Sequence, residues 1–127
     1  MPLSPSKPRS DARLIAEKQG RRAEALAALW LQLQLYRVLE RRFKTPVGEI
    51  DLIAERFGTT VFIEVKARTR NAGEFEALGK VNQRRLVRAA NYYLSRHPEK
   101  AASPLRFDVI FLAPRQWPRH LKAAFTS

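Results

Sequence analysis

The strongest structural signal in the chain comes from two neighbouring stretches, Gly48-Glu49-Ile50-Asp51-Leu52-Ile53 and Val61-Phe62-Ile63-Glu64-Val65-Lys66. Both are apolar runs rich in the residues that favour β-strands, and both carry carboxylates within the run. Successive side chains of a strand point to opposite faces, so Glu49 and Asp51 should lie on one face of the first strand. The two stretches therefore predict adjacent strands that carry acidic side chains.

The second stretch combines a carboxylate with a lysine. Glu64 and Lys66 are two residues apart, so they should point to the same side of the strand, and the apolar residues around them indicate burial on both sides. Charged groups in such a strand are costly to bury unless they are paired or bind a metal. Because carboxylate oxygens suit hard cations such as Mg²⁺ or Mn²⁺, phosphodiester chemistry is the leading candidate.

Periodicity predicts an α/β domain in which a mixed central sheet is flanked by helices in the order α-β-β-β-α-β-β. Helices are predicted over 11–35 and 78–96, and strands over 36–43, 49–55, 59–67 and 105–112. Residues 121–125 are either a last strand or a helical turn. In the first helix Leu26, Leu29 and Leu33 follow the spacing of one face, which predicts the apolar face. Residues 1–10 should form a flexible tail and 11–127 a single domain.

Charge limits the classes of partner. Lys plus Arg number 24 against 12 Asp plus Glu, for a net charge of +12 in 127 residues. Such a domain attracts polyanions, with nucleic acid the default; an anionic membrane surface or a charge that serves solubility alone remains an alternative. With no cysteine, disulfides and thiolate metal sites are excluded. No signal peptide or membrane span is predicted, so we expect a cytoplasmic protein.

The two strand stretches, the second extended to Ala67-Arg68, resemble the YraN-type family of small bacterial proteins, related to the PD-(D/E)xK nucleases. Further matching pieces are Gly20-Arg21-Arg22-Ala23-Glu24, Gln83-Arg84-Arg85-Leu86, Arg106-Phe107-Asp108-Val109 and Leu121-Lys122-Ala123-Ala124-Phe125. The resemblance implies a restriction-endonuclease-like core, similar to that of archaeal Holliday-junction resolvases. It also implies a metal-dependent nuclease site at Asp51, Glu64 and Lys66, with Glu24 as a carboxylate carried by the first helix.

Some positions depart from the family pattern. A glycine is usual where this chain has Ala23, and another is usual at Leu35, just before the first strand. A lysine is usual where this chain has Asn82, although Lys80 lies two residues upstream. None of these departures touches Asp51, Glu64 or Lys66.

The chemistry suggests a role for each residue. Asp51 and Glu64 would hold Mg²⁺ or Mn²⁺, and Glu49 would extend the metal site. Lys66 would orient a water or stabilise negative charge, and Glu24 would join if the first helix packs across the strands. We predict that DNA contacts Arg68, Lys80, Gln83, Arg84 and Arg85.

The expected function is therefore a metal-dependent endonuclease acting on DNA, with branched or repair intermediates among the candidate substrates. The alternative is a non-catalytic nucleic-acid-binding module on the same fold, and a third option is an interaction protein. The oligomeric state is open, with a homodimer as one option.

Overall fold

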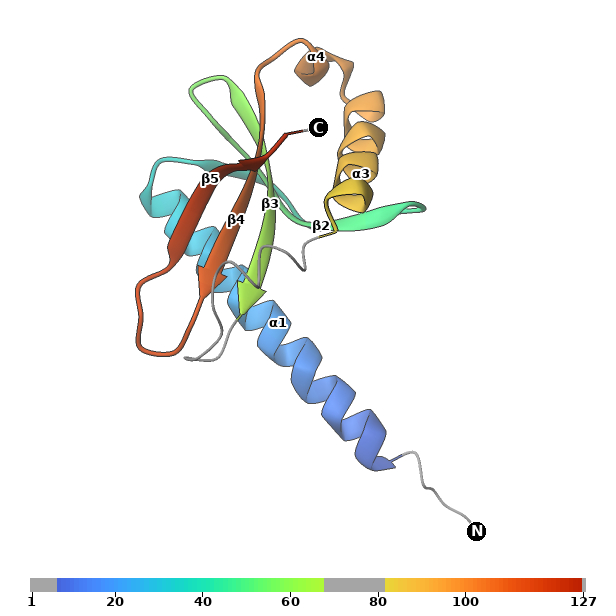
Figure 1. Ribbon diagram of the computed structural model, residues 1–127, viewed down its shortest axis with the longest axis vertical. Coiled ribbons are helices and arrows are strands. Elements are labelled where there is room, and N and C mark those ends of the chain that lie inside the picture. The colour runs from blue at the N-terminus through green and yellow to red at the C-terminus, as the bar shows by residue number, and fades with distance from the viewer. Residues whose placement is uncertain (1–6, 68–81, 127) are drawn as a thin grey trace.

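The computed structural model describes residues 7–67 and 82–126, with side chains in the first helix described from residue 20 onward. A five-stranded sheet with the order β1-β2-β3-β4-β5 forms its centre (Figure 1). Neighbouring strands are antiparallel except for the parallel pair β3–β4. The bounds are β1 Arg37–Thr45, β2 Gly48–Arg56, β3 Thr59–Ala67, β4 Leu105–Leu112 and β5 Arg119–Phe125.

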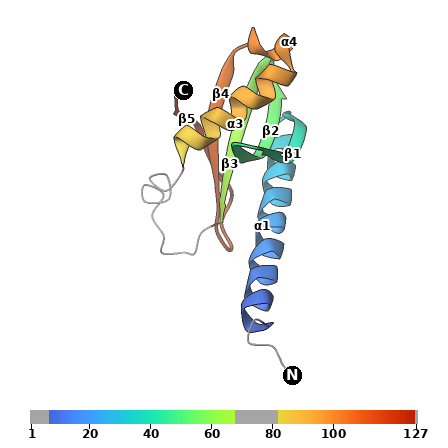
Figure 2. The same ribbon diagram turned by 90° about the vertical axis from the view of Figure 1, so that its right-hand side faces the viewer.

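Helices contribute to two hydrophobic cores. Helix α1 (Lys7–Leu33) buries Ala27, Ala28 and Leu31 in the first core, and α3 (Gln83–Arg96) buries Leu86 and Tyr93 in the second. Since Val61 and Ile63 of β3 belong to the first core and Phe62 to the second, the two helices cover opposite faces of the sheet. Figure 2 shows α1 running well past the strands toward its N-terminus. Within the described ranges, no helix is both long and apolar enough to cross a membrane.

The predicted α/β class and element order are confirmed, and residues 119–125 form a strand rather than a helical turn. Helix α1 begins at Lys7, inside the predicted tail. Helix α3 begins at Gln83; the predicted start at residue 78 lies outside the described residues. A short helix, α4 (Pro98–Ala101), was not predicted.

The predicted apolar face of α1 was wrong. Leu26, Leu29 and Leu33 are 57%, 52% and 69% exposed, whereas the small residues Ala27 and Ala28 are fully buried. Leu31, four residues after Ala27, is also fully buried, so α1 packs on the sheet through the side that carries Ala27, Ala28 and Leu31. Glu24 lies three and four residues before the two alanines, so it shares their side of the helix.

The end of α1 gives a physical reason for the glycine that the family usually has at position 35. Leu35 has φ 71°, in the left-handed region that glycine favours. The Tyr36 N donates to the Leu31 O at 2.9 Å and the Leu35 N to the Gln32 O at 3.0 Å. This is the pair of hydrogen bonds that closes a helix in a Schellman motif.

Strand β2 bends sharply at Asp51. Ile50 and Ile53 pack in the same core under α3, although strict alternation would place them on opposite faces. The pairing of β2 with β3 extends only as far as Leu52 opposite Ile63, while β2 continues beside β1 to Gly48. Arg42 lies across from the bend and has φ 53°, again in the left-handed region. The β1–β2 ribbon thus departs from the sheet at Arg42 and Asp51.

A fully buried carboxylate fastens β5 to the rest of the sheet. Asp108 accepts two hydrogen bonds from Arg106 at 2.9 Å, one from His120 Nε2 at 2.6 Å and one from the Ala123 N at 2.9 Å. Arg106 also donates to the Tyr36 hydroxyl at 2.6 Å. Burial would raise the pKa of Asp108, but the hydrogen bonds from His120, Arg106 and Ala123 hold it below its ordinary value. The role of Asp108 is structural, in agreement with its omission from the predicted site.

Candidate metal centre

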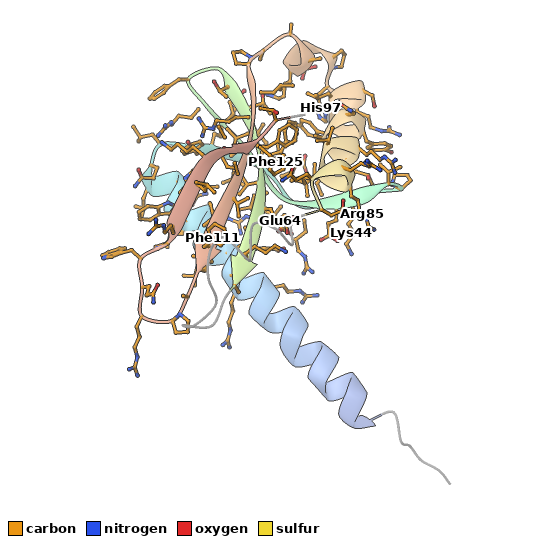
Figure 3. The ribbon with its side chains drawn as sticks, viewed as in Figure 1. Lys44, Glu64, Arg85, His97, Phe111 and Phe125 are labelled. Atoms are coloured by element: carbon orange, nitrogen blue, oxygen red, sulfur yellow. The ribbon has the colours of Figure 1, made fainter. Side chains whose placement is uncertain are left out.

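An open cleft of about 410 Å³ lies where α1, β2, β3 and the first turn of α3 meet. Its wall is strongly charged, with both acidic and basic side chains. Figure 3 labels Glu64 near the centre of the view and Arg85 at the start of α3. The lining residues are Glu24, Arg42, Glu49, Asp51, Glu64, Lys66, Asn82, Arg85 and Leu86.

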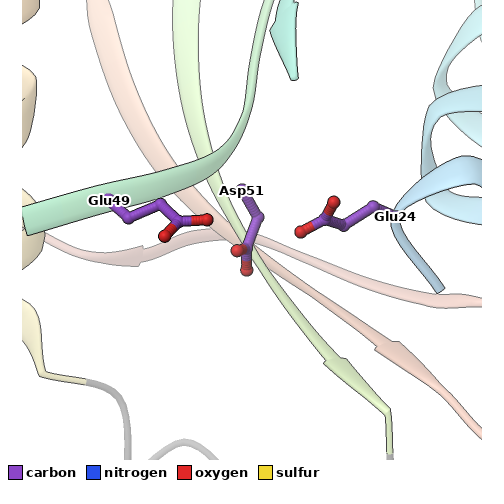
Figure 4. Close-up of side chains that lie close together, drawn as sticks. All are labelled: Glu24, Glu49 and Asp51. Atoms are coloured by element: carbon purple, nitrogen blue, oxygen red, sulfur yellow. The ribbon is translucent and has the colours of Figure 1, made fainter. Parts of the chain in front are cut away.

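Three carboxylates converge in this cleft. Glu24 comes from α1, and Glu49 and Asp51 come from β2; one oxygen of each lies within 4.8 Å of the others. Figure 4 shows Asp51 between the two glutamates, at the bend of the β2 ribbon. Two oxygens that each bind one cation at about 2.0–2.6 Å can be up to about 5 Å apart. The three carboxylates are therefore close enough to share a single ion.

The bend of β2 explains how residues from both faces of the sheet meet. Because β2 separates from β3 beyond Leu52, Asp51 lies at an opening between the strands. Its Oδ2 accepts a hydrogen bond from the Val65 N at 2.7 Å, which holds the side chain in place. Glu24, on the helix that covers the opposite face, reaches Asp51 through this opening.

Glu64 and Lys66 lie on the same side of β3, as their spacing predicts, and both line the cleft. Lys66 Nζ is 3.9 Å from Glu64 Oε1. Burial, the negative charge of Asp51 and a hydrogen bond with the Asp51 carboxyl raise the pKa of Glu64 to about 8, despite the opposing effect of Lys66. Near neutral pH, Glu64 can therefore exchange a proton.

Glu24 has a similarly raised pKa. Its side chain is only 12% exposed, and burial followed by the charge of Asp51 raises its pKa to about 7, against the opposing effect of Arg42. Both shifts have the same causes, burial first and then repulsion by the charge of Asp51. An all-oxygen, acidic donor set of this kind fits a hard divalent cation such as Mg²⁺ or Mn²⁺.

The positively charged side chain of Arg42 lies among these carboxylates. Arg42 Nε is 3.3 Å from Glu24 Oε1 and 3.8 Å from Glu49 Oε1. Sequence reasoning missed this residue, because an arginine in a basic strand carries no motif. What distinguishes Arg42 is its backbone conformation, a φ of 53°, and this can be seen only in the folded chain.

The cleft brings together most of the predicted site. Glu24, Glu49, Asp51, Glu64, Lys66 and Arg85 all line it. The predicted metal ligands were Glu49, Asp51 and Glu64. The three carboxylates whose oxygens converge are Glu49, Asp51 and Glu24. Gln83 and Arg84 are exposed on the first turn of α3, outside the lining. Arg68 and Lys80 lie outside the described residues.

Comparison with known proteins places these residues in a family. The model of the uncharacterised protein family UPF0102 matches residues 23–112, which is more than half of the chain. The chain belongs to the UPF0102 family. The match begins at the buried stretch of α1 and ends with β4, so it includes Glu24 and the β2–β3 hairpin. The resemblance to the YraN-type family is thereby confirmed.

Relatives within UPF0102 match almost the whole domain. A UPF0102 protein of Rhodopseudomonas palustris is 51% identical over 120 residues, which cover 94% of this chain and 92% of the relative. One from Parvibaculum lavamentivorans is 51% identical over 112 residues, covering 88% and 84%. One from Bartonella tribocorum is 44% identical over 109 residues, covering 86% and 84%.

Proposed function

We propose that this UPF0102 protein is a Mg²⁺- or Mn²⁺-dependent nuclease that hydrolyses phosphodiester bonds of DNA. The observation that carries the proposal is the convergence of Glu24, Glu49 and Asp51 within 4.8 Å, in a cleft that also contains Glu64 and Lys66. The resemblance of the strand motifs to PD-(D/E)xK nucleases supports it. Carboxylates gathered beside a lysine suit phosphoryl chemistry better than they suit stability, because uncompensated buried charge is costly.

In this proposal Glu24, Glu49 and Asp51 hold the ion. Asp51 can do so while its carboxylate is hydrogen-bonded to the Val65 N and to Glu64, because its two oxygens offer about four acceptor sites in all. A bound divalent ion supplies positive charge to the phosphate oxygens and helps to activate a water.

The remaining cleft residues have complementary tasks. Glu64, with its pKa raised to about 8, is suited to accept a proton from the attacking water when ionised. Lys66, beside it on β3, brings positive charge to the oxygens of the reacting phosphate. Both are partly buried at the cleft wall, with side chains 22% and 23% exposed, which strengthens their electrostatic effect relative to bulk water.

The first turns of α3 supply a surface for the DNA backbone. Arg84, Arg85 and Arg88 are exposed there, and Arg85 lines the cleft itself. Arginine is well suited to phosphate because its planar guanidinium can donate two parallel hydrogen bonds. A phosphodiester held by Arg85 at the cleft would lie close to the carboxylates, and the net charge of +12 favours the encounter.

The experiment is a cleavage panel with linear duplex, single-stranded, flapped and four-way DNA, in Mg²⁺, in Mn²⁺ and in EDTA. We expect cleavage that requires the metal, and a loss of about 100-fold or more in Asp51→Asn and in Lys66→Ala. Glu99→Gln, in the exposed helix α4, is the matched control and should cut like the wild type. Tight binding without cleavage of any substrate would favour the non-catalytic binding module.

A further inference from the structure

Arg42 occupies an unusual position for a strand arginine. Its Nε lies 3.3 Å from Glu24 and 3.8 Å from Glu49, two of the three carboxylates that could share an ion. The Nε is buried and has no hydrogen-bond partner within the described residues, so the attraction is between charges rather than through a formed hydrogen bond. The guanidinium therefore forms ion pairs beside the proposed cation site without a hydrogen bond from its Nε to fix them.

The backbone holds Arg42 in this place at a cost. Its φ of 53° is in the left-handed region, which non-glycine residues enter rarely. Arg41 pairs with Leu52 and Phe43 with Ile50, so Arg42 lies opposite Asp51 at the bend of the β1–β2 ribbon. A strained residue beside a charged cleft is a recognised mark of a functional position.

We infer that Arg42 is an internal counter-ion that competes with the divalent cation for Glu24 and Glu49. The inference rests on the proposed metal site and adds a determinant of its affinity. In the metal-free protein the guanidinium offsets the repulsion among the carboxylates. When an ion binds, Arg42 is repelled from the carboxylates, because a divalent cation at contact distance repels a neighbouring positive charge. The side chain is 34% exposed, so it has room to turn toward the open cleft.

The test is calorimetric titration of the whole chain with Mg²⁺, without DNA, at pH 8.5, which lies above the raised pKa values of Glu24 and Glu64. Arg42→Asn removes the charge and keeps a residue that tolerates the left-handed region. Because a competing unit charge at this distance is lost, we expect Mg²⁺ to bind about 10-fold more tightly. Arg42→Gln, which is closer in length, should change the affinity in the same direction.

The matched control is Arg41→Asn, because Arg41 is the exposed neighbour on the same strand and does not line the cleft. It should bind Mg²⁺ like the wild type. Arg42→Lys keeps a positive charge and should also retain weak binding. Circular dichroism verifies that each variant is folded before it is titrated.

The possible failures can be told apart. Equal Mg²⁺ affinity in wild type and folded Arg42 variants overturns the role of Arg42 and leaves the metal site standing. Tighter binding in the variants with no DNA cleavage by any protein supports the role of Arg42 and overturns the nuclease. Absence of Mg²⁺ binding in every protein, the Arg42 variants included, overturns both.

Discussion

The backbone N of Val65 donates a hydrogen bond of 2.7 Å to Asp51 Oδ2. This contact joins β3 to β2 just beyond Leu52, where the pairing of the two strands has ended. Asp51 therefore does two things at once: it stands between Glu24 and Glu49 in the acidic group, and it replaces a missing backbone hydrogen bond of the sheet. The two roles can be separated by substitution.

Asp51→Asn and Asp51→Ala should differ in stability and agree in metal binding. The Asp51→Asn variant keeps an oxygen that can accept from the Val65 N and loses a repelling charge. This variant should therefore unfold in EDTA at the same urea concentration as the wild type or at a higher one. Alanine leaves the Val65 N without its partner and should cost about 1–2 kcal/mol. Both should lose Mg²⁺ binding in calorimetry. Equal stability of the two variants would show that the Val65 contact contributes nothing.

The raised pKa values of Glu24 and Glu64 predict how stability depends on pH without metal. A group whose pKa is higher in the folded than in the unfolded protein stabilises the fold at low pH, and this contribution is lost as pH rises through the folded value. With values of about 7 and about 8, the free energy of unfolding in EDTA should fall between pH 5 and pH 9. We expect a decrease of about 2 kcal/mol or more.

Urea denaturation in EDTA across this pH range measures the effect. Glu64→Gln should flatten the dependence, since an amide cannot ionise, whereas Glu99→Gln on α4 should leave it unchanged. Saturating Mg²⁺ should restore stability at the alkaline end. A wild type that becomes more stable from pH 5 to pH 9 in EDTA would contradict the proposed repulsion.

Local sequence patterns were sufficient to predict the strands and to predict that Glu64 and Lys66 lie on the same side of β3. Glu64 and Lys66 could be placed on one side because β3 is regular and paired along its length with β4. The same alternation fails across Asp51, because the β1–β2 ribbon bends there, opposite Arg42 of β1. That bend is a tertiary feature with no local signature.

The face of α1 that packs on the sheet could not be predicted from the sequence pattern either. Leu26 and Leu29 have the stronger apolar pattern, yet α1 packs on the sheet through Ala27, Ala28 and Leu31. Periodicity ranks the faces of a helix by hydrophobicity and does not say which face the sheet covers. Whether Glu24 reaches the strands therefore depended on a contact that only the folded chain specifies.

The network around Asp108 should make a large contribution to stability. Asp108→Asn keeps the shape but loses the charge that Arg106 and His120 face in a fully buried position. Removing the charge of one partner in such a buried ion pair should lower the free energy of unfolding by about 3 kcal/mol or more. Urea unfolding at pH 7 measures it. A cost below that of an ordinary surface substitution would mean that the network is dispensable.

The same network predicts behaviour in acid. Because the pKa of Asp108 is lower in the folded protein, its contribution is present above the ordinary aspartate value and is lost as pH falls through the folded value. Wild type should therefore lose stability below about pH 4 more steeply than Asp108→Asn, since the variant has no carboxylate to protonate there.

The basic face of α3 can be tested through the salt dependence of DNA binding. Arg84→Ala and Arg85→Ala should each weaken duplex binding and reduce the slope of log K against log salt by about one, since each removes about one phosphate contact. Fluorescence anisotropy over a series of salt concentrations measures the slope. Lys122→Ala on the far edge strand β5 is the charge-matched control. An unchanged slope in both α3 variants would place the DNA elsewhere.

Replacing Leu35 with glycine should stabilise the protein. Its φ of 71° closes α1 in a conformation that costs a non-glycine residue about 1–2 kcal/mol, and its side chain is 75% exposed, so little packing is lost on its removal. Leu35→Gly relieves that strain but frees the unfolded chain, for a net gain of about 0.5–1 kcal/mol. Leu35→Ala is the matched control, because it removes the same exposed side chain and keeps the Cβ that causes the strain. Thermal unfolding should therefore show a midpoint raised by about 2–4 °C for glycine and nearly unchanged for alanine. If alanine stabilises as much as glycine, the gain comes from losing an exposed leucine, and the backbone at the end of α1 is not strained.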